Sequence, residues 1–212
     1  MPKQKIPVSA IPRLSLYYRA LLESRETGYI SSDELAQLTN FTAAQVRKDL
    51  TYFGQFGTPG RGYEIEALKK SILKILGTDK EWSVALVGVG NLGTALLSYK
   101  GFSKQGFKIK CAFDSDIRKI GKNLEGVTIQ DITELEEEIK KEGIRLGIVA
   151  VPQGVAQNVV GILVKGGVKA ILNFAPMRPQ APRSVEMLNI DLSIELERLA
   201  YFLTRGKKRG LR

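Results

Sequence analysis

The feature that most constrains this chain is a glycine motif between a valine-rich apolar run and a helix-like segment. Residues 82–87 read WSVALV, a short apolar run typical of a buried parallel strand, and the next six residues read GVGNLG. In such a strand-to-helix turn, the first glycine permits the tight turn, the second lets the backbone approach a pyrophosphate, and the third lets helix and strand pack closely. We expect all six residues to bind a nucleotide at the helix N-terminus: Gly88, Val89, Gly90, Asn91, Leu92 and Gly93.

Strand-like and helix-like segments alternate after this motif. Apolar runs recur at residues 107–113, 146–151 and 168–172, and helix-like stretches lie at 92–99, 132–141 and 153–165. Strands that alternate with helices are typical of a parallel α/β sheet. The sequence therefore predicts a Rossmann-type domain over residues 81–190.

An acidic residue follows the second predicted strand. Asp114 lies 21 residues beyond Gly93, where a carboxylate can bond both ribose hydroxyls of an adenosine and disfavour a 2′-phosphate. This favours NAD over NADP, although Arg118 and Lys119 lie nearby and weaken the preference. A Rossmann fold without a ligand and a CoA-binding fold of the same class are the alternatives.

Two further loops follow predicted strands, where open α/β sheets bind their ligands. They place Pro152, Asn173 and Phe174 where the nicotinamide half of a dinucleotide would lie, although ordinary turn chemistry explains these residues equally well. Tyr99 closes the helix after the glycine motif, and by residue type it favours packing over ligand contact.

The first 80 residues predict a separate helical domain. Helical spacing of apolar residues marks segments 13–26 and 64–76, and two shorter helices are expected to start near Ser31 or Ser32 and after Thr42. Residues 54–63 contain four glycines and one proline, which is typical of a tight turn or hairpin.

The two short helices have the layout of a helix-turn-helix, and the glycine-rich hairpin after them suggests a wing. Residue types on the second helix suit DNA, because arginine and glutamine can read base edges and lysine and tyrosine can reach phosphates. A wing arginine can enter a narrow minor groove. The candidate DNA-binding residues are Thr42, Gln45, Arg47, Lys48, Tyr52 and Arg61. A helical bundle with a solvated charged face is the alternative, since residues 1–80 carry a net charge of only +4.

Composition narrows the function classes. The chain of 212 residues has no histidine and one cysteine, Cys111, so neither a disulfide within the chain nor a zinc site of the usual Cys/His kind is expected. The lack of histidine also removes the commonest general base, which makes an enzyme less expected, although an enzyme that uses lysine, tyrosine or a carboxylate remains an alternative. No apolar run approaches the roughly 20 residues that span a bilayer, and no signal peptide is evident, which favours a cytoplasmic protein.

The last predicted helix and the residues after it form a third region, 191–212. Residues 193–202 are apolar around much of the helix circumference, a pattern normally found in buried helices. Five of the last eight residues are basic, and they supply half of the net charge of +10: Arg205, Lys207, Lys208, Arg209 and Arg212. Such a charge suggests a polyanionic partner.

Several of these blocks together resemble the Rex family of bacterial redox-sensing transcriptional repressors. The resemblance covers essentially the whole chain. It rests on AAQVRKDLTYFGQFG at 43–57, GVGNLG at 88–93, the Phe113-Asp114 pair, the loop at 150–152 and ILNFAP at 171–176. It implies an N-terminal winged helix, a Rossmann domain that binds NADH and NAD+, and a homodimer that exchanges its C-terminal helix.

The resemblance also implies roles for individual residues. Tyr99 and Asp191 fall where the family senses the bound nicotinamide, and Arg13 is their expected N-terminal partner in redox coupling. One departure lies in the wing, where many members have a Lys-Arg pair before the glycine and this chain has Thr58-Pro59. Arg61 is then the only wing cation, which puts the minor-groove contact in doubt.

We therefore expect a homodimeric repressor that binds a palindromic double-stranded operator and is released when NADH, sensed but not turned over, binds in place of NAD+. An NAD-dependent oxidoreductase with an accessory helical domain is the alternative, and it would need Tyr99 or Lys100 as proton donor. A third possibility is a CoA-binding or nucleotide-binding module that never contacts DNA. Measurement of operator binding while NADH or NAD+ is added separates these three hypotheses.

Overall fold

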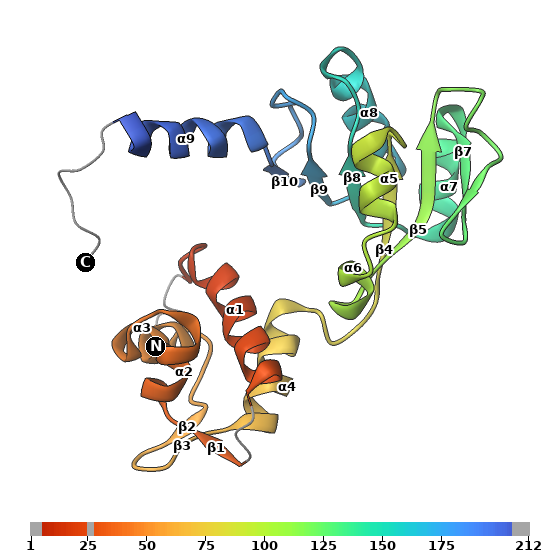
Figure 1. Ribbon diagram of the computed structural model, residues 1–212. Coiled ribbons are helices and arrows are strands. Elements are labelled where there is room, and N and C mark those ends of the chain that lie inside the picture. Colours follow the sequence, from red (N-terminus) through yellow and green to blue (C-terminus); the bar gives the residue numbers. More distant parts are fainter. Residues whose placement is uncertain (1–5, 25–27, 205–212) are drawn as a thin grey trace. The chain divides into compact units, whose positions relative to one another are not determined.

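The computed structural model describes residues 6–24 and 28–204. The basic residues that end the sequence, Arg205 to Arg212, lie outside the described residues. The chain divides into two units, Met1–Glu81 and Trp82–Arg212, and each is described by itself (Figure 1).

Unit 1 combines four helices with a small antiparallel sheet. The strands are β1 (Tyr29–Ile30), β2 (Gly57–Thr58) and β3 (Gly62–Glu64), and β3 pairs with both of the others. The helices are α1 (Ala10–Glu23), α2 (Ser32–Thr39), α3 (Ala43–Thr51) and α4 (Ile65–Leu76). Their apolar faces meet in one core that includes Leu14, Tyr17, Leu35, Val46, Leu50 and Leu68. A helix-turn-helix formed by α2 and α3, followed by the β2–β3 hairpin, is a winged helix.

The first helix begins three residues earlier than its apolar spacing indicated. It includes Pro12 within its first turn, where the proline's missing N–H would have no helical partner in any case. The helix ends at Glu23, because Ser24 has extended backbone angles.

Unit 2 is built on a seven-stranded sheet with the order β10-β9-β8-β4-β5-β7-β6. All neighbouring pairs are parallel except β6 and β7. The strands are β4 (Trp82–Val87), β5 (Phe107–Asp114), β6 (Asn123–Leu124), β7 (Val127–Asp131), β8 (Leu146–Val149), β9 (Ala170–Asn173) and β10 (Glu186–Asn189). The chain leaves β4 toward β5 on one side and later returns to β8 on the other. The carboxyl ends of β4 and β8 therefore form the switch point where doubly wound sheets bind ligands.

Helices cover both faces of this sheet. The helices are α5 (Asn91–Leu97), α6 (Gly101–Lys104), α7 (Leu135–Glu142) and α8 (Gln153–Gly166). Ala85 and Val87 of β4 pack with residues of α7 and α8, while Val84 and Leu86 point the other way and pack with α5. This alternation along one strand produces a three-layer α/β/α arrangement, as the sequence predicted.

Cys111 is part of the core on the α7 and α8 face and is 2% exposed. Burial and the nearby carboxylates of Glu138 and Glu142 raise the pKa of its thiol to about 12. The thiol is therefore protonated at neutral pH, which suits a packing role and not the thiolate chemistry of a redox-sensing cysteine.

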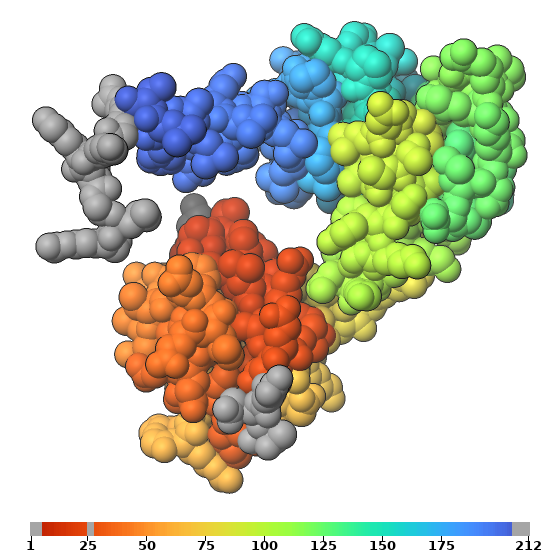
Figure 2. All heavy atoms as spheres, in the orientation of Figure 1, coloured from red at the N-terminus to blue at the C-terminus, as the bar shows by residue number. Residues whose placement is uncertain are grey.

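The last helix was expected to pack against a partner subunit, and in the single chain its apolar side chains are exposed. Helix α9 (Leu192–Thr204) forms as predicted, but none of its side chains is buried in this single chain (Figure 2). Its large apolar residues are all roughly half exposed or more: Leu192, Ile194, Leu196, Leu199, Tyr201, Phe202 and Leu203. An apolar surface of this kind marks an interaction site.

Neither a membrane-spanning helix nor a cluster of metal ligands occurs among the described residues. No helix there is long and apolar enough to cross a membrane. Nor does that part of the chain hold a group of three or more metal-ligating acids or cysteines.

Candidate functional site

The helix-turn-helix is set by caps on both of its helices. Ser31 and Glu34 form a reciprocal capping box at the start of α2, with the Glu34 N–H 3.1 Å from the Ser31 Oγ and the Ser31 N–H 2.7 Å from a Glu34 carboxylate oxygen. Asn40 then adopts a left-handed conformation and ends α2. Thr42 caps α3 by accepting a hydrogen bond from the Gln45 N–H. The chain thus turns within three residues, as the sequence predicted.

A buried carboxylate ties the second helix of this motif to α1. Asp49 of α3 has no exposed surface, and Arg13 of α1 donates two hydrogen bonds to it, at 2.5 and 2.7 Å. The Tyr17 hydroxyl and the Gln45 side-chain amide donate two more, at 2.8 and 2.7 Å. Burial alone would raise the pKa of Asp49, but the bonds from Arg13, Tyr17 and Gln45 outweigh burial and lower it.

The sequence did not predict this network, which engages two candidate residues, Gln45 and Arg13, in bonds within unit 1. The Gln45 amide nitrogen is engaged with Asp49, and the Arg13 guanidinium holds the same carboxylate. A signal was present in the sequence, because Asp49 lies between Val46 and Leu50 on the inward face of the helix. An acid at an inward position requires donors from a neighbouring element.

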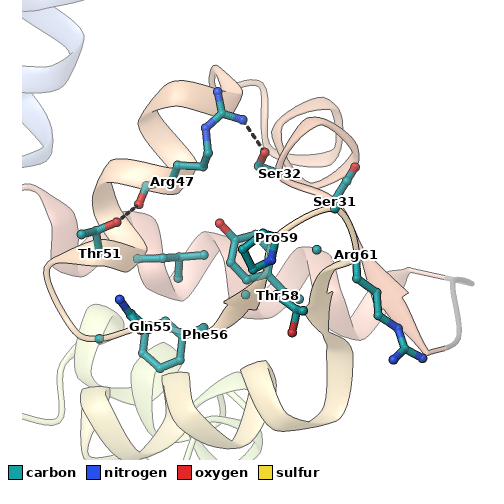
Figure 3. A pocket seen from close by; sticks show the side chains of 15 residues that line it. Ser31, Ser32, Arg47, Thr51, Gln55, Phe56, Thr58, Pro59 and Arg61 are labelled. Carbon is teal, nitrogen blue, oxygen red and sulfur yellow. Dashed lines mark hydrogen bonds between the residues drawn. The ribbon is translucent and has the colours of Figure 1, made fainter.

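The outward side of α3 carries the basic residues. Arg47 and Lys48 are exposed, Thr42 is exposed at the N-terminal end, and Tyr52 is half-buried just after the last turn. The Arg47 guanidinium donates to the Ser32 hydroxyl at 2.6 Å, which holds the side chain against the start of α2 (Figure 3). Arg47 and Lys48 thus remain on the solvent side of the helix, as the sequence predicted.

The wing is a hairpin with a proline–glycine turn. Pro59 and Gly60 form its tip, Gly60 has a positive φ of 76°, and the Arg61 N–H donates to the Thr58 carbonyl at 3.0 Å. The Arg61 guanidinium stacks on the ring of Tyr29, 4.0 Å from its centroid. A groove of about 640 Å³ lies between α3 and the wing, with Arg47 and Arg61 among its lining residues (Figure 3).

The glycine turn after β4 has the geometry that the motif predicted. Gly88 has a φ of 93°, and an added Cβ would lie 2.4 Å from the Ala150 carbonyl oxygen. A Cβ on Gly93 would lie 1.9 Å from the Gly88 oxygen, so this position permits the close packing of α5 on the turn. A Cβ on Gly90 would meet no protein atom within 4 Å. The open side of Gly90 is the surface that a phosphate group can approach.

Asp114 completes this turn from the neighbouring strand. Its carboxylate accepts hydrogen bonds from the Val89 N–H at 2.8 Å, the Asp116 N–H at 2.9 Å and the Lys119 amine at 2.9 Å. Burial alone would raise the pKa of Asp114, but these bonds lower it, so the group is ionised at neutral pH. Lys119, whose charge weakened the predicted preference for NAD over NADP, therefore holds the Asp114 carboxylate in place. Arg118 instead pairs with Asp116.

The other two loops that follow strands differ in the exposure and bonding of their candidate residues. Pro152 is exposed and precedes the first residue of α8, and Phe174 is half-buried after β9. Asn173 has no exposed surface, and its side chain bonds to the loop at 175–177 and to Asn189. Its side chain therefore organises the loop from within.

Each of the three residues that are expected to couple redox state to DNA binding contacts a different residue within its own unit. The Tyr99 ring is 59% exposed and contacts Phe102 edge-on, with ring centroids 5.1 Å apart. The Asp191 carboxylate accepts from the Ser193 N–H at 2.9 Å, at the start of α9. Arg13 holds Asp49, as described above.

Comparisons with known proteins agree with this architecture. Residues 5–51 match the family model described as “Putative DNA-binding protein N-terminus”, and residues 79–177 match the model described as “CoA binding domain”. The redox-sensing transcriptional repressor Rex of Desulfitobacterium hafniense is 47% identical over 203 residues, covering 95% of this chain and 97% of the relative. The Rex repressor of Desulforamulus reducens is 43% identical over 98% of this chain and its own full length.

Solved structures show the same relationship. The crystal structure of RSP in complex with beta-NAD+ and operator DNA superposes with a TM-score of 0.91 at 37% identity, covering 95% of this chain and 94% of that one. RSP in complex with beta-NADH has a TM-score of 0.83 at 36% identity, covering 95% and 96%.

The fold and both candidate sites define a winged-helix protein with a nucleotide-binding unit of the Rossmann type. The chain belongs to the Rex family of redox-sensing transcriptional repressors. It is therefore a regulator, and the oxidoreductase alternative is set aside because its relatives are named as repressors.

Proposed function

We propose that this protein is a cytoplasmic homodimeric repressor that binds a palindromic operator and leaves it when NADH binds. The observation that carries the proposal is the glycine turn of unit 2, in which Gly90 is open and the Val89 N–H donates to the ionised carboxylate of Asp114. It occurs in the same chain as a winged helix. RSP, its structural relative, has been crystallised with beta-NADH and with beta-NAD+ and operator DNA.

The nucleotide would lie along the carboxyl edge of the sheet. The turn from Gly88 to Gly93, with Val89, Asn91 and Leu92, would hold the pyrophosphate, and Asp114 would bind the adenosine ribose. Pro152 and Phe174 would flank the nicotinamide half. The bound ring is cationic when oxidised and neutral when reduced, so a nearby carboxylate such as Asp191 and the Tyr99 hydroxyl would distinguish the two forms.

The operator would be read by α3 and the wing. Arg47, Lys48, Thr42 and Tyr52 would contact base edges and phosphates in the major groove. One hydrogen of the Gln45 amide nitrogen is bonded to Asp49, so a base contact through Gln45 would use its carbonyl oxygen or its second amide hydrogen. Arg61 would approach the DNA backbone with its guanidinium stacked on Tyr29.

The dimer would be formed by exchange of α9. The exposed apolar side chains of this helix need a partner surface, and α1 with the residues before it also exposes apolar side chains, among them Val8, Ile11 and Leu22. We infer that α9 of one subunit covers such a surface on its partner. Coupling of Arg13 with Tyr99 and Asp191 would then arise within the dimer.

The test is operator binding followed by fluorescence anisotropy. The probe is a labelled duplex of the operator bound by RSP, or a site selected from random DNA with the nucleotide-free protein. We expect NADH to raise the operator Kd at least about 10-fold, a coupling within the usual range, and NAD+ to raise it far less. Equal operator affinity with NADH, NAD+ and no nucleotide would refute the sensor function, and release by CoA alone would indicate a different ligand.

Two neighbouring aspartates, Asp114 and Asp116, supply a test variant and its control. Asp114→Ala removes the proposed ribose ligand, and we expect it to weaken NADH binding at least 10-fold while operator binding without nucleotide is unchanged. Asp116→Ala removes a neighbouring carboxylate that pairs with Arg118, and it serves as the control. Unchanged NADH affinity in Asp114→Ala would remove Asp114 from the nucleotide site.

A further inference from the structure

Asn173 lies where the sheet, a ligand-side loop and the last helix meet. It is the final residue of β9, paired in register with Val149 of β8 on one side and with Asn189 of β10 on the other. It therefore stands at the carboxyl edge of the sheet, next to the strand that adjoins the glycine-turn strand β4. Its side chain has no exposed surface.

The side chain of Asn173 uses both of its chemical ends. Its amide nitrogen lies 2.8 Å from the Met177 carbonyl oxygen, 2.9 Å from the Asn189 Oδ1 and 3.3 Å from the Ala175 carbonyl oxygen. An amide nitrogen has two hydrogens, so the two shorter contacts, to Met177 and Asn189, are its principal bonds. The Asn173 Oδ1 accepts from the Ala175 N–H at 3.1 Å.

These bonds join two segments that are distant in sequence. The loop at 174–177 follows β9 on the edge where we place the nucleotide, and residues 189–190 lead directly to Asp191 and α9. The backbone of Asn173 reinforces the connection, because its carbonyl accepts from the Ile190 N–H at 2.8 Å. These bonds therefore connect the loop directly to the residues that lead into α9.

Only an amide satisfies this arrangement. An aspartate at position 173 would face the oxygens of Met177 and Asn189 without a hydrogen to donate, and an apolar residue would leave the Ala175 N–H without its acceptor. At position 189 the requirement is simpler, because the bond uses only the side-chain oxygen of Asn189. Asn189 is exposed on the edge strand, so it can be changed without disturbing the core.

We propose that Asn173 and Asn189 form an amide clasp that transmits the nucleotide state of the 174–177 loop to helix α9. The proposal rests on the proposed function, since it assigns the path by which nucleotide binding reaches the dimer helix. Asn173 and Asn189 are positioning residues here: the clasp sets the link between the two segments and contributes little to affinity for either ligand.

The test compares three variants of the whole chain. The quantity measured for each variant is the ratio of the operator Kd with saturating NADH to the operator Kd without NADH. Asn189→Ala removes the acceptor, Asn189→Asp retains an oxygen at the same place, and Asn158→Ala changes an exposed asparagine of α8 as a control. We expect Asn189→Ala to keep both the NADH Kd and the nucleotide-free operator Kd within about 3-fold. Its ratio should fall at least about 5-fold, while the other two variants keep the wild-type ratio.

Hydrogen exchange supplies a second readout. In the wild type, NADH should change amide protection in the first turns of α9, and in Asn189→Ala it should not. A wild-type ratio in Asn189→Ala would overturn the clasp, and so would loss of NADH binding in that variant, because the residue would then belong to the binding site itself. A ratio near one in the wild type would instead refute the proposed function before any variant is compared.

Discussion

The two candidate sites are held in place by different chemistry. In unit 1 the DNA-reading helix is fastened by an ion network, in which Arg13, Tyr17 and Gln45 all donate to the buried carboxylate of Asp49. In unit 2 the glycine turn is held by close backbone packing at Gly88 and Gly93 and by one bond from the Val89 N–H to Asp114, and the loop after β9 is organised by the neutral amide of Asn173. The first arrangement depends on ionisation, whereas the glycine packing and the amide depend on shape and hydrogen bonding.

This difference suits the two proposed tasks, which are DNA binding by unit 1 and nucleotide binding by unit 2. A charged network is strong when complete and costly when one partner is lost, so it can hold a helix in one orientation and release it when a donor is withdrawn. Glycine packing has no such alternative state, because the backbone atoms already touch. We infer that the glycine turn is a rigid cradle and that adjustable contacts lie elsewhere, around Asp49 and Asn173.

The largest effect is expected from the loss of the Asp49 carboxylate. Asp49→Ala would leave the Arg13 guanidinium without its partner and the buried Tyr17 hydroxyl without its acceptor, which destabilises unit 1 by about 3 kcal/mol. Glu66→Ala, which breaks the exposed pair with Lys69, is the control and should cost less than about 0.5 kcal/mol. Urea unfolding followed by circular dichroism measures both. Equal stability of the two variants would show that the Asp49 network does not hold the helix.

The glycine turn predicts a contrast between two similar variants. Gly93→Ala would place a Cβ against the Gly88 carbonyl and should cost roughly 1–3 kcal/mol of stability, with nucleotide binding lost as the turn shifts. Gly90→Ala meets open space, so the fold should be unchanged while NADH affinity falls at least about 10-fold. Thermal unfolding and NADH fluorescence separate the two effects. Tight NADH binding by Gly90→Ala would contradict the approach of a phosphate at this position.

A smaller effect is expected from the exposed face of the recognition helix. Arg47→Ala should weaken operator binding by roughly 1–3 kcal/mol and leave NADH binding unchanged, because Arg47 is exposed on the side of α3 that we propose contacts DNA. Lys70→Ala removes an exposed cation from α4 of the same unit and is the control. Anisotropy with the labelled operator measures the loss, and wild-type affinity in Arg47→Ala would exclude this residue from DNA readout.

The smallest effect concerns pH. The pKa of Asp49 is lower in the folded protein than in an unfolded chain, so the ionised network adds stability above about pH 4 and loses it as the pH falls further. Asp49→Asn lacks this contribution. The difference in unfolding free energy between wild type and Asp49→Asn should therefore narrow from pH 5 to pH 2. A difference that stays constant over this range would show that folding does not lower the pKa of Asp49.

The sequence was most informative where a residue's role is local. The glycine turn, the capped helices of the helix-turn-helix and the main strands follow from spacing and residue type within a few positions, and all of them are present. The sequence did not predict β1, β6, β7 and the edge strand β10. Pairing with distant segments stabilises β1, β7 and β10 more than their own composition does, and β6 is a two-residue strand that pairs with the adjacent β7.

The same reasoning explains what was missed in the sites. Asp49 was not selected because its partners come from α1, more than thirty positions away. Asn173 was predicted as a ligand contact, which stays a prediction, and its side-chain bond to Asn189, sixteen positions away, was not foreseen. The apolar helix α9 was expected from the family resemblance to pack against a partner subunit, and it is exposed in the single chain, so its exchange between subunits stays a prediction.

The measurement that tests the account most directly is reciprocity between the two ligands. If NADH and operator DNA bind to opposing states of one dimer, saturating operator must weaken NADH binding by the same factor by which NADH weakens operator binding. NADH fluorescence titrations with and without the operator duplex give this factor. We predict equal factors of at least about 10-fold, and an NADH Kd that is the same with and without operator would contradict the account.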